Sequence, residues 1–300
     1  MTDPTAAVMT RHAVDSDGLR LAVFETSRVG PTIVFVHGFP DTHAVWDPVI
    51  ADLRDRFHCV AYDVRGAGES EVPSSRGQYA LSCLVTDLVA VLDVVSPDRP
   101  VHVVGHDWGS VQAWDAVVRE KSDPRLAGRI SSYTTISGPC LDHVRAFAHA
   151  ARRGNGKERR EGLQQLVHSW YIFAFQVPWL PELALRNGYR QLLAKGCRSL
   201  AHFESTLPED AAHGLNLYRA NLRRRSRVPG GPSTDLPVLL VVALRDNYVL
   251  PQLTRDLHRF AANLTRAEID AGHWVPRSHS AQLASIVAEF VSRHDGDHTR

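Results

Sequence analysis

Apolar runs of strand length alternate with amphipathic stretches from the start of the chain to Gly138-Pro139. The runs are rich in β-branched residues and bounded by Gly, Pro or Asp, which is typical of buried strands in a parallel sheet. Four of them are expected to form strands: 19–25, which follows an Asp17-Gly18 hairpin turn, 32–36, 58–62 and 101–104. Helical spacing predicts three helices: 46–53, 82–95 and one that begins after Asp107 and ends near Glu120. This alternation predicts an α/β fold with a doubly wound, mostly parallel sheet.

The alternation stops after residue 139, and the segment 140–236 has helical and loop character but no convincing parallel strand. Within this segment, the charged stretch 152–161 is expected to be a mobile loop and the Pro/Gly-rich stretch 226–235 a linker. Strand and helix patterns then resume, as strands at 238–244 and 266–270 and helices at 252–261 and 281–292. We therefore expect one α/β domain built from 1–139 and 237–300, with a helical cap inserted at 140–236.

A sharp turn follows the strand expected at 101–104, in the sequence Gly105-His106-Asp107-Trp108-Gly109. Such a strand-to-helix turn leaves no room for a Cβ at the two glycine positions and projects its middle residue above the sheet. The N-terminus of the following helix favours a negative charge there. Asp107 is therefore the candidate nucleophile, and the alternative is an ordinary aspartate at a helix N-cap.

Two more polar residues follow late strands. Asp246 comes directly after the strand expected at 238–244, and His273 follows the last expected strand. Both are expected at the carboxyl edge of the sheet, where open α/β folds bind ligands. The order nucleophile, acid, histidine predicts a triad in which the acid orients the imidazole. Asp63 is a weaker catalytic candidate, because its loop at 63–70 reads as structural and lacks the glycine spacing of a nucleotide site.

Composition narrows the class of protein. A chain of 300 residues with 44% hydrophobic and 22% charged residues is ordinarily globular, and a net charge of +1 gives no field that would recruit nucleic acid. No apolar run approaches the ~20 residues needed to span a bilayer, and the first residues lack a signal-peptide pattern. The scattered cysteines and histidines form no CxxC or HExxH group, so we expect free thiols, a cytoplasmic location and no metal or organic cofactor.

Five motifs resemble the epoxide hydrolase branch of the α/β-hydrolase superfamily: HGFPD (37–41), DVRGAGES (63–70), GHDWGS (105–110), LRDNYV (244–249) and AGHWVP (271–276). The resemblance spans nearly the whole chain. It implies opening of an epoxide by water to a vicinal diol, through an ester on Asp107 that His273 and Asp246 hydrolyse. It also implies that the backbone N–H groups of Phe39 and Trp108 form an oxyanion hole, where an ordinary Gly-Pro turn is the alternative at Phe39.

The same resemblance assigns two tyrosines in the inserted segment. SWYIFAFQVP (169–178) is similar to the first tyrosine motif of the family and carries Tyr171, and LNLYRAN (215–221) is similar to the second and carries Tyr218. Both are expected to donate hydrogen bonds to the epoxide oxygen, and the alternative is that both are core aromatics. The substrate is expected to be a small lipophilic epoxide, such as a lipid epoxide to be detoxified. Its pocket is expected to be lined by Trp46, Trp108, Phe175 and Trp179.

Several alternatives remain open. The core motifs are shared with haloalkane and fluoroacetate dehalogenases, although Phe39 replaces the asparagine of many of the former and Trp108 replaces the arginine of the latter. A non-catalytic ligand-binding homologue and a homodimer are also open. The segments 137–143 and 210–221 most resemble the hydrolase half of actinobacterial proteins in which this domain is fused to a short-chain dehydrogenase. This chain is expected to have no room for a dehydrogenase domain. The basic run 219–227 is expected to be a solvated helix face, with contact to lipid headgroups as the alternative.

Overall fold

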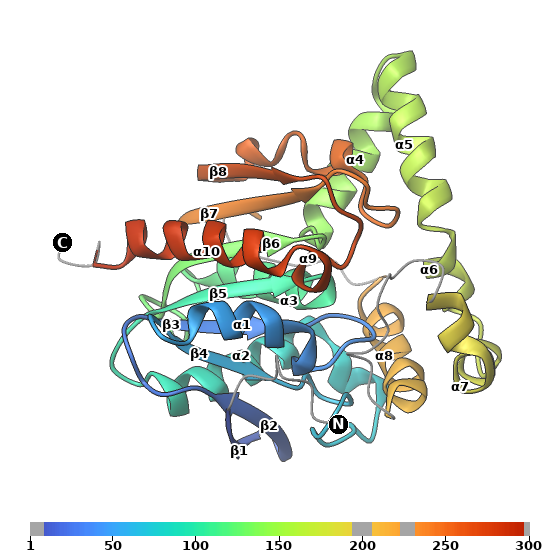
Figure 1. Ribbon diagram of the computed structural model, residues 1–300. Coiled ribbons are helices and arrows are strands. Elements are labelled where there is room, and N and C mark those ends of the chain that lie inside the picture. The colour runs from blue at the N-terminus through green and yellow to red at the C-terminus, as the bar shows by residue number, and fades with distance from the viewer. Residues whose placement is uncertain (1–8, 194–205, 223–231, 297–300) are drawn as a thin grey trace.

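One eight-stranded sheet organises the backbone of the protein (Figure 1). The computed structural model describes residues 9–193, 206–222 and 232–296. The strand order is β1-β2-β4-β3-β5-β6-β7-β8. The strands are β1 (Thr10–Ser16), β2 (Leu19–Glu25), β3 (Thr32–Val36), β4 (His58–Tyr62), β5 (Val101–His106), β6 (Ile130–Ile136), β7 (Thr234–Ala243) and β8 (Ala261–Ile269). The β1–β2 and β2–β4 pairs are antiparallel and all other neighbours are parallel, so the predicted mostly parallel sheet is confirmed.

Helices cover both faces of the sheet (Figure 1). One face carries α1 (Asp47–Leu53) and α10 (Ser280–His294), and the other carries α2 (Leu81–Val95) and α3 (Trp108–Arg119). Each face has its own apolar core, because the strands are buried on both sides. The doubly wound arrangement therefore follows from the alternation of strands and helices in the sequence.

β6 is a central strand that the apolar pattern does not reveal, since its sequence ISSYTTI is mostly hydroxylic. All of its residues are buried. The hydroxyl of Thr135 lies 2.6 Å from that of Ser110 on α3 and accepts a hydrogen bond of 3.1 Å from the indole N–H of Trp114. These bonds to α3 allow a polar strand to occupy the middle of the sheet without unpaired hydroxyls.

Between β6 and β7, the described residues form five helices, which we call the helical insertion. They are α4 (Leu141–Arg153), α5 (Gly156–His168), α6 (Trp170–Ala174), α7 (Leu180–Leu193) and α8 (Leu207–Asn221). α5 projects away from the sheet (Figure 1). α8 is tied to the sheet domain by Asn221, whose amide donates to the carbonyl of Tyr79 at 2.9 Å and accepts the N–H of Leu81 at 2.9 Å. The division of the chain at 139 and 236 into core and cap stays a prediction.

The stretch 152–161 is helical, so the prediction of a loop there is wrong. α4 runs through Arg153, and α5 begins after a break of two residues. The side chain of Asn155 accepts the N–H groups of Lys157 and Glu158, while the Glu158 carboxylate accepts the N–H of Asn155 at 2.8 Å. This reciprocal capping box stabilises the start of α5 against the neighbouring glycines that suggested a loop.

The segment 252–261 forms no α-helix, contrary to the prediction. It contains two short 3₁₀ helices, η3 (Pro251–Thr254) and η4 (Leu257–Arg259), and β8 begins at Ala261. Pairing with β7 takes Ala261, the last position of the predicted helix. β7 begins at Thr234, inside the stretch expected to be a linker, because Thr234 pairs with Ala261 of β8.

Among the described ranges of the chain, no helix is long and apolar enough to cross a membrane. Cys59, Cys83 and Cys140 are free thiols, whereas Cys197 lies outside the described residues. Burial raises the pKa of both Cys59 and Cys140 to about 12, so these thiols stay protonated and unreactive at neutral pH.

Acid should destabilise the protein through His143 on α4. Burial lowers the pKa of this imidazole to about 4, while its Nε2–H donates to the carbonyl of Pro232 at 2.7 Å. Unfolded chains bind this proton below pH ~6.5, so the stability that His143 contributes is present above that pH and is lost as pH falls toward its folded pKa. The loss amounts to about 3 kcal/mol at most. Urea unfolding at neutral and acidic pH should show a smaller acid loss for His143→Gln than for wild type.

The matched control is His149→Gln, an exposed position on the same helix. It should lose as much stability on acidification as wild type. An equal acid loss in all three proteins would contradict this account of His143.

Candidate active site

The turn between β5 and α3 holds Asp107 in a conformation that few residues adopt. Its φ is 52° and its ψ is −123°, a strained region that costs of order 1–3 kcal/mol and is concentrated at functional sites. A Cβ on Gly105 would lie 2.6 Å from the Cα of Ser110, and one on Gly109 would collide with the carbonyl oxygen of Val36. Both glycines are therefore required for this turn, as the sequence predicts.

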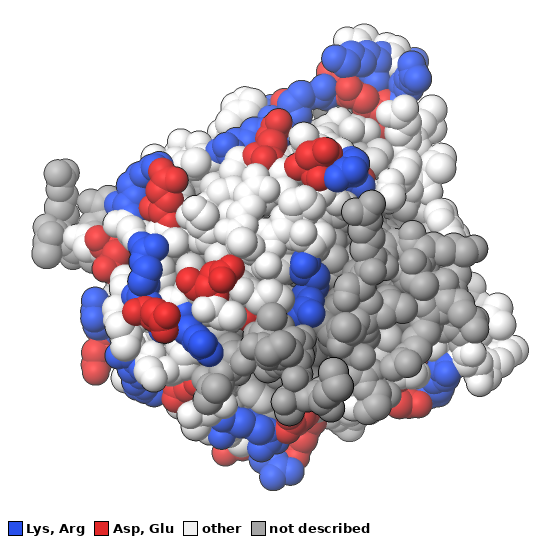
Figure 2. Space-filling view, viewed as in Figure 1, with Lys and Arg blue, Asp and Glu red and all other residues white. Residues whose placement is uncertain are grey.

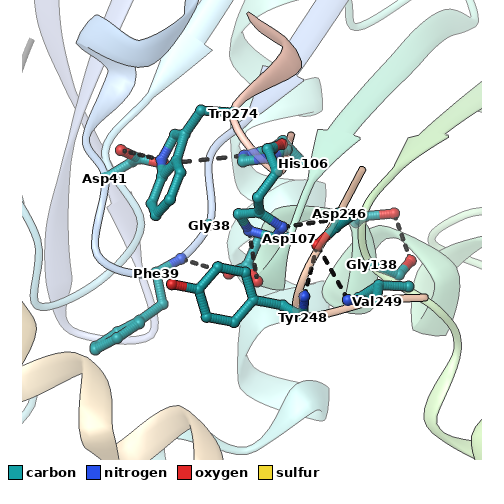
Figure 3. A network of polar contacts seen from close by, with 12 residues as sticks. Gly38, Phe39, Asp41, His106, Asp107, Gly138, Asp246, Tyr248, Val249 and Trp274 are labelled. Carbon is teal, nitrogen blue, oxygen red and sulfur yellow. Dashed lines mark hydrogen bonds and ion pairs between the residues drawn. The ribbon is translucent and has the colours of Figure 1, made fainter. Parts of the chain in front are cut away.

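The carboxylate of Asp107 has two distinct environments (Figure 3). Oδ1 accepts the backbone N–H of Phe39 at 2.7 Å, while Oδ2 lies 3.5 Å from Nε2 of His273. A Cβ on Gly38 would lie 2.5 Å from Oδ1, so this glycine lets the loop after β3 approach the carboxylate. Trp108 is the first residue of α3, so its backbone N–H has no acceptor within the helix. One carboxylate oxygen is thus bound by the predicted oxyanion loop and the other faces the imidazole.

Asp246 and His273 form the pair expected from their strand ends. Nδ1 of His273 lies 3.0 Å from Oδ2 of Asp246, and the N–H groups of Tyr248 and Val249 donate to Oδ1 of Asp246 at 2.7 and 3.1 Å. Burial lowers the pKa of His273, but the charge of Asp246 and the hydrogen bonds to both carboxylates outweigh it, so the pKa is raised. With Asp107 ionised, His273 is therefore an imidazolium at neutral pH.

A buried network beneath His273 was not found from the sequence. Nε2 of His106 donates to the backbone carbonyl of His273 at 3.0 Å, and its Nδ1 lies 3.8 Å from Oδ2 of Asp41. The indole N–H of Trp274 donates to the same oxygen at 3.1 Å. Burial and then the charge of His273 lower the pKa of His106, so His106 stays neutral and acts as a fixed hydrogen-bond donor. These contacts position the backbone that carries His273.

Two cavities meet at Asp107. The larger, of about 710 Å³, is lined by Phe39, Asp107, Tyr171, Phe175, Tyr218, Tyr248 and His273 together with apolar side chains of the helical insertion. The smaller, of about 150 Å³, also contacts Asp107, Tyr171 and Tyr218, and it reaches Trp108. The ring centroids of Tyr171 and Tyr218 are 6.1 Å apart, and those of Tyr218 and Trp108 are 4.9 Å apart. Both predicted tyrosines are therefore brought to the space above the predicted nucleophile.

Burial, followed by the charges of Asp107 and Asp246, raises the pKa of Tyr171 above its ordinary value. Its hydroxyl therefore stays protonated across the physiological range and remains a hydrogen-bond donor. Tyr248 also lines the cavity, with its ring 4.8 Å from that of His273. The sequence analysis missed this residue, although it stands two positions after Asp246 in a motif that was recognised.

Three predicted roles are wrong. Trp46 is fully buried under the opposite face of the sheet and lines neither cavity, because it belongs to the core with α1 and α10. Trp179 is exposed and lies outside the cavity lining. Arg219 is not solvated, since its buried guanidinium donates to the carbonyls of Phe175 and Val177 at 2.7 and 2.6 Å. The remainder of the basic run lies outside the described residues.

Asp63 is structural. Its buried carboxylate accepts the N–H and Nδ1–H of His43 at 2.8 Å each and the N–H of Glu69 at 2.9 Å, and it does not line the cavities at Asp107. Within the part of the chain that the structure describes, no three histidine, cysteine or carboxylate side chains gather in a way that could hold a metal ion.

Comparisons with known proteins define the class. The family model described as "alpha/beta hydrolase fold" matches residues 31–156. A solved structure among novel epoxide hydrolases of the α/β-hydrolase superfamily, from metagenomes of hot environments, has a TM-score of 0.77 at 25% identity and covers 95% of this chain and 99% of that one. The Bacillus megaterium epoxide hydrolase bound to an inhibitor has a TM-score of 0.78 at 21% identity, covering 94% and 100%, and shows the same fold. The chain has the α/β-hydrolase fold, so the predicted fold is confirmed.

Curated proteins named as epoxide hydrolases are among the relatives of this chain. The chain is 36% identical to "Probable oxidoreductase EphD" of Mycobacterium tuberculosis over 98% of this chain and 51% of that protein. It is 27% identical to "Epoxide hydrolase A" of the same organism over 94% of this chain and 97% of that protein. The chain thus spans about half the length of the first of these relatives.

Proposed function

We propose that this protein is an epoxide hydrolase that converts a lipophilic epoxide to a vicinal diol through an ester on Asp107. The observation that carries the proposal is one cavity that combines a carboxylate, an imidazole–carboxylate pair and two tyrosine hydroxyls. A nucleophile with its own base supports a two-step hydrolysis, and two neutral donors support an alkoxide leaving group.

In the first step, Oδ2 of Asp107 attacks an epoxide carbon and the C–O bond to the ring oxygen breaks. Tyr171 and Tyr218 donate hydrogen bonds to that oxygen, and one of them supplies the proton that completes the hydroxyl. Phe39 N–H holds Oδ1, which becomes the carbonyl oxygen of the ester. The apolar cavity walls exclude water, which strengthens each of these interactions.

In the second step, His273 removes a proton from water, and the water oxygen attacks the ester carbon on Asp107. Ester formation has by then removed the negative charge of Asp107, which is one cause of the raised pKa of His273. The pKa of the imidazole therefore falls after the first step, so His273 gives its proton to the tyrosinate that the first step leaves and becomes available as a base. The N–H groups of Phe39 and Trp108 stabilise the oxyanion, which collapses as the ester C–O bond to the diol oxygen breaks. That oxygen takes the proton of the new carboxylic acid, which restores the Asp107 carboxylate, and the proton from water stays on His273.

We further propose that the substrate is lipophilic and that the protein acts in a reducing compartment such as the cytoplasm. The cavity walls contributed by α5, α6 and α7 are apolar and support the first statement. The free thiols of Cys59, Cys83 and Cys140 support the second.

The two tyrosines distinguish epoxide opening from halide displacement. An alkoxide is a poor leaving group that needs a proton, whereas a halide leaves as a weak base. Tyr171→Phe and Tyr218→Phe should each slow alkylation by an epoxide about 10²–10³-fold, and the double variant should lose more. Single-turnover alkylation by styrene oxide and by a 1-bromoalkane measures both reactions in the same proteins.

Phe175→Leu, which alters the cavity wall without removing a donor, is the control for packing changes. Fast halide release that ignores both tyrosines, with no diol from any epoxide, would contradict the proposed function and favour a dehalogenase.

A further inference from the structure

The outer face of the helical insertion carries an apolar stripe that points to solvent. Leu163, Leu166, Trp170 and Phe173 follow one another at helical spacing along α5 and α6, and all of them are exposed. Trp170 is 67% exposed and Phe173 is 57% exposed. An amphipathic helix normally turns such a stripe to its own core, so an outward stripe marks an interaction surface.

The start of α7 continues this surface. Trp179 is 71% exposed, and Leu180 and Leu183 are also exposed. We call the exposed apolar side chains between Leu163 and Leu183, on α5, α6, the segment joining α6 to α7 and the first turn of α7, the apolar face. Large aromatic side chains that combine an apolar body with a polar N–H, as in its two tryptophans, are typical of the boundary between lipid and water.

A basic tip adjoins the apolar face where α4 meets α5. Arg152, Arg153, Lys157, Arg159 and Arg160 are all exposed, and within the described ranges none of them forms an ion pair. The two acidic residues of the tip are engaged, since Glu158 caps α5 and Glu161 pairs with Arg255 at 2.6 Å. Figure 2 shows this basic tip at the upper right, with uncharged surface along the edge below it.

The apolar face also forms the rim of the larger cavity. Val167, Trp170, Val177 and Leu180 are exposed and at the same time line the cavity that contains Asp107. A molecule that leaves a phase in contact with the apolar face would therefore enter the cavity without crossing water.

We propose that the apolar face and the basic tip dock the protein on a membrane surface that carries anionic headgroups, with the cavity opening toward the lipid. Exposed aromatic and aliphatic side chains insert at the headgroup boundary, and the neighbouring cations bind the anionic headgroups. Cations beside the stripe favour this occupant over a second copy of the chain, which would present the same positive charge. The docking goes beyond the proposed function, while the entry of substrate from lipid rests on it.

Vesicle sedimentation tests the docking without any need for activity. The protein should sediment with vesicles of phosphatidylcholine containing phosphatidylglycerol, less with phosphatidylcholine alone, and less as salt is raised. Arg159→Glu/Arg160→Glu should need at least about tenfold more lipid for half-maximal binding. The matched control is Arg76→Glu/Arg99→Glu, which changes the net charge equally at exposed positions outside the insertion and should bind as wild type does.

A second variant tests the apolar contribution. Leu163→Gln/Trp179→Asn changes two exposed side chains outside the cavity lining, and asparagine tolerates the φ of 52° at position 179. It should weaken vesicle binding about tenfold while leaving the melting temperature and turnover of a water-soluble epoxide unchanged.

Failure of the wild type to bind anionic vesicles at low salt would overturn the docking proposal, as would equal binding by the Arg159/Arg160 variant and its control. A dimer in sedimentation velocity that Leu163→Gln/Trp179→Asn disrupts, without vesicle binding, would assign the face to a second copy instead. An inactive protein that still binds vesicles would contradict only the proposed function.

Discussion

Replacing Asp107 with alanine should abolish diol formation and leave the fold intact. The substitution removes the attacking oxygen, and the loss of a nucleophile typically lowers the rate by at least about 10⁴-fold. Asp107 lies at a strained turn and contacts Phe39 N–H and His273 rather than packing in a core, so its removal leaves no core cavity. The rate of diol formation and the thermal melt of the variant test both parts of this expectation.

Asp107→Asn is the matched variant, because it keeps the shape of the side chain and its tolerance of positive φ but loses the negative charge. Residual activity above a tenth of wild type in folded Asp107→Ala would exclude Asp107 as the nucleophile. If Asp107→Ala unfolds while Asp107→Asn stays folded, the alanine variant loses activity because the turn is disrupted. Activity of the folded asparagine variant then tests the nucleophile separately from the fold.

Replacing His273 with glutamine should block the second step and spare the first. Alkylation of Asp107 needs no base, whereas attack of water on the ester does, so the ester should accumulate. Intact-mass spectrometry after mixing with an epoxide should show an adduct of the substrate mass on the peptide that contains Asp107. Steady-state turnover should fall by about 10⁴-fold or more.

His149→Gln, on the surface of α4, controls for the substitution itself and should form no lasting adduct. If His273→Gln forms no adduct and its first step is as slow as its second, the proposed division of labour between Asp107 and His273 is wrong. An adduct on another peptide would move the nucleophile elsewhere.

The three proposed reacting residues could be picked out of the sequence because each of them lies near the end of a strand. Asp107 directly follows β5, while Asp246 and His273 lie in the loops that follow β7 and β8, and parallel strands bring their carboxyl ends to one edge of the sheet. The two glycines of the turn can also be predicted from the sequence, since a Cβ at either position would collide with backbone atoms. Local sequence therefore determines this part of the site.

The residues that support the site from beneath cannot be predicted from the sequence in the same way. The contact between Trp274 and Asp41 joins residues 233 positions apart, and the bond from His106 to the carbonyl of His273 spans 167. No periodicity signals such a contact. Trp46 shows the same limit, because an aromatic residue in a helical pattern does not reveal which face of the sheet will cover it.

The prediction of secondary structure failed where tertiary contacts override the local preference of the sequence. β6 is polar in sequence, and its hydroxyls find partners on α3 and on β5 that are distant in the sequence. The stretch 252–261 has helical spacing, yet its last residue, Ala261, pairs with β7 as the start of β8. The charged stretch 152–161 was read as a loop from its glycines, whereas a capping box stabilises the helix that starts there.

The origin of the oxygen in the diol tests the central claim most directly. Excess enzyme is mixed with an epoxide in water labelled with the heavy oxygen isotope, and the diol of the first turnover is analysed by mass spectrometry. If Asp107 forms the ester, the new oxygen of that diol comes from the carboxylate and is unlabelled, while the label appears in the Asp107 peptide. Labelled diol in the first turnover, with an unlabelled Asp107 peptide, would show direct attack by water and contradict the account.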